Sequence, residues 1–193
     1  MIHFTPTEEP DLFDREVRQP GQRWLRTHGD AADRPRAYWT RVCPLLATAF
    51  RHLCAYSAMY EPVGTVDHYR SCSKEPELAY EWSNYRFASA WINSSKQSAD
   101  TEVLDPFEVE DEWFEILLPS LQLVTTPNVP AHLREKANHT LERLHLRDDE
   151  RVVRQRRAWY ALYQEGMLSI EGLDMRAPLI AAAVRKQLEA RGA

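Results

Sequence analysis

The sequence has few cysteines and no long hydrophobic run, and each lack excludes a class of protein. The three cysteines, Cys43, Cys54 and Cys72, are an odd number without a C-x-x-C pair, which argues against a disulfide framework and a four-cysteine zinc site. We expect reduced, mostly buried thiols. No apolar run approaches the roughly 18 residues of a membrane span, and residues 1–10 lack the basic start and apolar stretch of an export signal. We therefore expect a cytoplasmic protein without a membrane partner.

Charge of one sign is also missing from two segments. The net charge is −5, yet residues 34–60 carry four arginines and no acid, whereas residues 99–129 carry eight acids and no base. Residues 130–193 carry twelve bases against nine acids. Polyanions respond to the local patch rather than to the total charge, so nucleic acid is not excluded if the fold brings the basic segments together. The alternative is that these side chains only solvate helix faces.

The chain is long enough for one buried core, and its 193 residues with 44% hydrophobic and 27% charged side chains are ordinary for a soluble domain. We divide it into an N-terminal arm (1–33), a helix followed by a central core (34–98), and an acidic segment with C-terminal helices of the same domain (99–193). The arm has few periodic apolar positions, which suggests a segment lying over the core or partly mobile.

Local patterns predict α+β structure. Apolar positions from residue 39 to 53 recur at helical spacing, with a kink or break at Pro44. Residues 64–69 and 84–88 read as strands joined by a polar loop with at most a short helical turn, and 88–97 as a helix. Further on, the acidic run reads as a solvated loop and 116–126 as a strand or extended segment. Helices are expected over 130–146, over 149–165, and from about 174 to the tail.

The polar residues of the central segment suit metal-assisted phosphodiester cleavage. Asp67 and Asn93 offer hard oxygen ligands of the kind that Mg²⁺ prefers, and a neutral imidazole at His68 can take a proton from water near pH 7. An Asp-His pair alone is more often a turn or a hydrogen-bonded pair. Its conjunction with Asn84 and Asn93 favours a catalytic site.

Three segments in this order resemble the HNH endonucleases: Gly64–Tyr69, Pro76–Asn84 and Ile92–Lys96. The resemblance covers Cys54 to Lys96. This segment is similar to the variant of the motif that has Asn in its middle and final positions, which occurs in small bacterial defence nucleases and in the HNH domain of the CRISPR effector. Many family members carry two C-x-x-C pairs around this core. Here those pairs are missing, so no structural zinc is expected.

The resemblance implies a ββα-metal (HNH) motif embedded in a mostly helical single domain. In it Asp67 and Asn93 hold one divalent ion, Mg²⁺ or Mn²⁺, and His68 is the general base. Asn84 joins His68 as a catalytic residue, since its amide in the middle position braces the loop and directs the imidazole.

The same resemblance implies that His68 deprotonates a water, which attacks phosphorus in line and leaves 5′-phosphate and 3′-hydroxyl ends. Lys96, Arg86 and Lys74 are then candidate contacts to nucleic-acid phosphates. It further implies an anti-phage or toxin effector, with an ATPase as partner by family analogy. DNA is expected rather than RNA, but strandedness, sequence preference and oligomeric state stay open. The alternative is a catalytically weak ββα module that binds nucleic acid or assembles with a protein.

Overall fold

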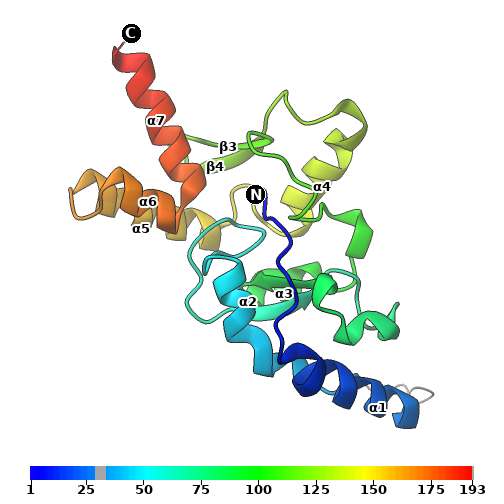
Figure 1. Cartoon of the computed structure of the whole chain (residues 1–193). Helices are drawn as coiled ribbons and strands as arrows, with labels where there is room; N and C mark the ends of the chain where they lie inside the picture. Colours follow the sequence, from blue (N-terminus) through cyan, green and yellow to red (C-terminus); the bar gives the residue numbers. More distant parts are fainter. Residues whose placement is uncertain (29–33, 193) are drawn as a thin grey trace.

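The chain folds into a mixed α+β structure, seen in a computed structural model that describes residues 1–28 and 34–192 (Figure 1). The described residues form seven α-helices and two two-stranded antiparallel sheets, β1–β2 and β3–β4. The strands are β1 (Thr65–His68), β2 (Tyr85–Ala88), β3 (Phe114–Leu117) and β4 (Gln122–Thr125). The helices are α1 (Gln19–His28), α2 (Cys43–Ala49), α3 (Ala90–Lys96), α4 (Arg134–Arg143), α5 (Glu150–Gln164), α6 (Ile170–Arg176) and α7 (Pro178–Gly192).

The central segment has the predicted order of elements: strand, loop, strand, helix. Strand β1 pairs antiparallel with β2 in a register that sets Asp67 opposite Arg86 and His68 opposite Tyr85. The loop between the strands holds only two short 3₁₀ turns, at Pro76–Tyr80 and Trp82–Asn84. The strand, loop and helix predictions for this segment are confirmed.

A glycine admits the close contact at the start of this unit. Gly64 has a positive φ of 44°, and a Cβ placed there would lie 2.1 Å from the ring of Phe87. A side chain at this position would therefore displace the aromatic residue that β2 packs over the start of β1.

The break expected at Pro44 is also present. A 3₁₀ turn at Tyr38–Val42 leads into α2, in which Pro44 occupies the first turn, where its missing N–H costs no hydrogen bond. The helix ends earlier than the apolar spacing suggested, because Arg51 and His52 both have positive φ and turn the chain back.

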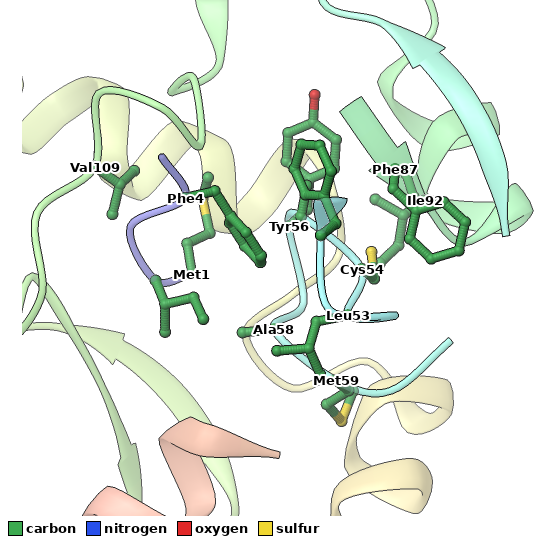
Figure 2. Close-up of a cluster of buried hydrophobic side chains, with 14 of the residues drawn as sticks. Met1, Phe4, Leu53, Cys54, Tyr56, Ala58, Met59, Phe87, Ile92 and Val109 are labelled. Atoms are coloured by element: carbon green, nitrogen blue, oxygen red, sulfur yellow. The ribbon is translucent and has the colours of Figure 1, made fainter. Parts of the chain in front are cut away.

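The N-terminal segment, for which the sequence suggested a position over the core or partial mobility, packs into the core with several of its described residues. Met1, Phe4, Phe13 and Val17 are buried, and the backbone N–H of Phe4 donates to the carbonyl of Pro106 at 3.1 Å. Figure 2 shows Met1 and Phe4 inside the cluster formed with the turn around Leu53–Met59 and with Val109. Phe13 and Val17 lie four residues apart in the helical stretch that continues into α1. Residues 1–10 have no regular secondary structure and contact parts of the chain far away in sequence, so Met1 and Phe4 follow no helical or strand period.

Two predictions for the C-terminal half also need correction. Residues 116–126 are not one strand but parts of the β3–β4 hairpin, because Pro119 cannot continue a ladder and Leu121 takes a positive φ of 61°. The tail holds two helices instead of one. Ser169 caps α6 through the N–H of Gly172 at 3.1 Å, and Pro178 opens α7.

The two other predicted C-terminal helices are present as α4 and α5, and Asp149 caps α5 by accepting from the N–H of Arg151. In Figure 1, α7 lies beside β3 and projects away from the strand–helix unit, whereas α1 lies at the opposite end of the molecule. None of the helices in residues 1–28 and 34–192 has the length and apolar character needed to cross a membrane.

Candidate functional site

A cleft of about 1000 Å³ opens along β1 and α3, and its lining includes Asp67, His68 and Asn93. The N-terminal helix α1 and the 3₁₀ turn that carries Trp39 supply another part of the lining. The structure therefore brings together three of the residues that the sequence singled out, from the end of a strand and the middle of a helix.

The His68 ring is held in one orientation. It packs edge-on against Trp39 and Tyr85, with ring centroids 4.5 and 5.0 Å away, and its Nε2 lies 2.9 Å from the carbonyl oxygen of Ala79. Because a carbonyl can only accept, Nε2 must carry the hydrogen, and the lone pair of the neutral ring then belongs to Nδ1.

The surroundings of His68 favour this neutral form. Burial of the ring lowers the pKa of His68, and the nearby ammonium of Lys96 acts in the same direction, against the opposing effects of the Ala79 carbonyl and Asp67. Nδ1 has no hydrogen-bond partner within the described residues and is not sealed from solvent. A half-buried, neutral histidine with a free ring nitrogen in a cleft can serve as a base.

Asn84 braces the loop between the strands. Its side-chain oxygen accepts from the N–H of Arg70 at 2.8 Å, and its nitrogen donates to the carbonyls of Arg70 and Leu78 at 3.0 and 3.1 Å. Leu78 directly precedes Ala79, whose carbonyl holds the His68 ring. The amide of Asn84 thus supports the loop that orients the imidazole, and it does not itself line the cleft.

Asp67 is almost fully enclosed, with its side chain 2% exposed. One carboxylate oxygen accepts from the hydroxyl of Tyr56 at 2.6 Å, and the other lies 3.2 Å from the ammonium of Lys96. Tyr56 has its ring in the hydrophobic cluster while its hydroxyl points out of that cluster (Figure 2). Burial, followed by the charge of Asp67, raises the pKa of Tyr56 well above its usual value, so the phenol stays a donor.

Asn93 completes the strand–helix contact. Its side-chain nitrogen donates to the carbonyl of Val66 at 3.2 Å. Because the backbone carbonyl of Val66 can only accept, the side-chain atom of Asn93 that faces it must be the amide nitrogen. The Asn93 oxygen is thereby left without a hydrogen-bond partner among the described residues.

These donors can be tested against the divalent ion that the resemblance implies. The described residues contain no cluster of three or more His, Cys, Asp or Glu side chains that could hold a metal. Asp67 and Asn93 instead offer two oxygen-bearing groups. Among the described residues each carboxylate oxygen of Asp67 has one hydrogen-bond partner, Tyr56 or Lys96, which leaves lone pairs free. Mg²⁺ is commonly bound by one or two such groups together with waters and substrate phosphates. The donor set fits Mg²⁺ on these terms.

Two of the three predicted phosphate contacts are buried. The Lys96 side chain has 0% exposure, and its ammonium donates to Asp67 and to the carbonyls of His68 and Tyr69 at 2.9 and 3.0 Å. Arg86 is 4% exposed and donates two hydrogen bonds, at 2.7 and 2.6 Å, to the Asp105 carboxylate. In this arrangement a phosphate reaches neither cation, because each one balances a buried carboxylate.

Lys74 is the exposed member of the three, with 51% of its side chain accessible. It donates to the carbonyl of Ser98 at 2.6 Å and lies 3.4 Å from the buried carboxylate of Asp100. The acidic segment therefore is not a purely solvated loop. Asp100 and Asp105 are buried and tie the segment to the site through Lys74 and Arg86.

The sequence patterns do not indicate two side chains that hold the site together, Tyr56 beside Asp67 and Trp39 beside His68. No local signal could have found these contacts, because each partner lies more than ten residues away along the chain.

Comparison with models of known protein families gives no match, and comparison with curated protein sequences gives none either.

Proposed function

We propose that this protein is a metal-dependent endonuclease of the HNH kind, which hydrolyses phosphodiester bonds in nucleic acid, with DNA as the expected target. The observation that carries the proposal is the state of His68, which lines a cleft together with Asp67 and Asn93. Its Nε2 is bound to a backbone carbonyl, and its Nδ1 has no hydrogen-bond partner among the described residues. The resemblance to HNH nucleases over residues 54–96 supports the same assignment.

The proposed reaction begins with proton transfer from a water to Nδ1 of His68. The Ala79 carbonyl accepts the Nε2 hydrogen, which keeps the ring in the required tautomer and stabilises the imidazolium that forms. A Mg²⁺ held by Asp67 and Asn93 would supply charge stabilisation to the scissile phosphate. Tyr56 and Lys96 keep the Asp67 carboxylate in one place, and Asn84 supports the loop behind the imidazole.

Incubation of the purified protein with supercoiled plasmid, single-stranded DNA and total RNA in Mg²⁺ or Mn²⁺ tests the proposal. Cleavage should require the metal, stop in EDTA, and fall by about 10²- to 10⁴-fold in His68→Ala. His132→Ala is a matched control, since His132 is exposed and outside the cleft. Cleavage that persists in EDTA or in His68→Ala would contradict the proposal.

A second candidate function is a binding or assembly module that cuts poorly. One observation favours it: the Asp67 carboxylate already has a cationic partner in Lys96 and is 2% exposed. Calorimetric titration of the protein with Mn²⁺ separates the two candidates. The nuclease should bind Mn²⁺, and Asn93→Ala should weaken that binding, whereas a module without the ion should show no heat in either form.

A further inference from the structure

The cleft has an aromatic surface that the proposed reaction does not use. Trp24 and His28 lie one turn apart on α1, and their rings stack with centroids 4.8 Å apart and an interplanar angle of 7°. Both residues line the cleft that contains His68. Trp24 is only half-buried and His28 is exposed, so part of this stacked pair is accessible from the cleft.

The fold positions this pair without giving it a role in the core. Gly21, one turn before Trp24, lets α1 approach Tyr80 so closely that a Cβ on Gly21 would lie 2.3 Å from the tyrosine ring. Leu25 packs against the hydrophobic core, whereas Trp24 is not among the side chains that do so. Packing of α1 therefore holds Trp24 at the cleft.

The remaining lining is polar but carries little positive charge. Asn93, Ser94, Gln97 and Ser98 border the cleft along and after α3, and Arg34 is the one Lys or Arg among the described lining residues. Hydroxyl and amide groups can hydrogen-bond sugar and phosphate oxygens. Affinity for duplex DNA comes largely from several phosphate-neutralising cations, and this lining lacks them.

We infer that the cleft binds unpaired nucleotides, with a base stacked on Trp24 and its sugar and phosphate along the polar side of α3. This inference rests on the proposed nuclease function and adds the substrate class: single-stranded or unpaired nucleic acid. Bases in a duplex are stacked on each other and cannot use an aromatic side chain, whereas unpaired bases stack on Trp readily and with little dependence on sequence.

Fluorescence anisotropy with labelled oligonucleotides tests the inference separately from cleavage. The His68→Ala protein is titrated in EDTA against a single-stranded DNA, a single-stranded RNA and a DNA duplex of one sequence. The single strands should bind more tightly than the duplex. Trp24→Ala should raise the Kd for single strands by about 5-fold to 100-fold, the range that one base–aromatic stack supplies, and Trp24→Tyr should restore most of the affinity.

Arg23→Ala is the matched control, because Arg23 is an exposed residue of α1 outside the cleft. Tighter binding of the duplex, absence of binding to single strands, or unchanged affinity in Trp24→Ala overturns the inference. Comparison of the DNA and RNA arms identifies the natural strand. Selective binding of single strands without metal-dependent cleavage would support this inference and refute the nuclease function. Metal-dependent cleavage, together with an affinity for single strands that Trp24→Ala leaves unchanged, would support the nuclease function and refute this inference.

Discussion

Replacement of Lys96 by Met tests whether this lysine is a buried counter-charge or a phosphate contact. Lys96 is the one ion-pair partner of Asp67 among residues 1–28 and 34–192, and its replacement leaves that carboxylate bonded to Tyr56. Breaking one side of a buried ion pair costs about 3 to 5 kcal/mol, because the remaining charge stays desolvated. For a chain of this length, each kcal/mol corresponds to roughly 2 to 4 °C, so Tm should fall by about 6 to 20 °C.

Urea unfolding in EDTA, followed by circular dichroism, measures this loss. The double variant Asp67→Asn with Lys96→Met should recover most of the stability, since neither charge is then left alone. Lys74→Met is the control: this half-exposed lysine should contribute less than about 1 kcal/mol. Mg²⁺ should stabilise the Lys96→Met protein more than the wild type, because a divalent ion would replace the missing positive charge.

A loss of less than about 1 kcal/mol in Lys96→Met, together with weaker nucleic-acid binding, would show that Lys96 is not a buried counter-charge. Lys96 would then be the surface contact that the sequence suggested.

Three further predictions concern neighbouring residues. Burial holds the pKa of His68 below its usual 6.5, so as pH falls the unfolded chain binds a proton at His68 before the folded chain does. In EDTA, the unfolding free energy of the wild type relative to that of His68→Asn should therefore fall as pH drops below about 6.5. A constant difference between pH 7 and pH 5 would contradict this expectation. Asn84→Ala should lower the unfolding free energy by about 2 to 3 kcal/mol, because it removes three hydrogen bonds to part-buried backbone groups of Arg70 and Leu78. It should also reduce cleavage in the fraction that remains folded. An unchanged urea midpoint and an unchanged cleavage rate would speak against the bracing role. Arg86→Met should destabilise the fold by about 3 to 5 kcal/mol, because it leaves the buried carboxylate of Asp105 without its cation. The oligonucleotide affinity of the folded variant, measured by anisotropy, should equal that of the wild type. A large loss of affinity without any loss of stability would show that Arg86 contacts phosphate.

The N-terminal segment shows where local patterns fail. Its apolar residues pack against loops and helices from other parts of the chain, for example Phe4 against Phe50 with ring centroids 4.8 Å apart. Residues in an extended segment that crosses the core are placed by their individual partners, so their spacing carries no period that a sequence pattern could detect.

The strand–loop–strand–helix unit follows from local sequence, because alternating and aromatic residues at 65–68 and 85–88 favour strands and the following segment favours a helix. The same local pattern places Asp67, His68 and Asn93 at the ends and faces of those elements. What each side chain does there depends on contacts with residues far away along the chain. Lys96 and Arg86 look like surface cations in sequence, yet their partners are buried carboxylates, and a charge removed from water must find a countercharge inside the fold.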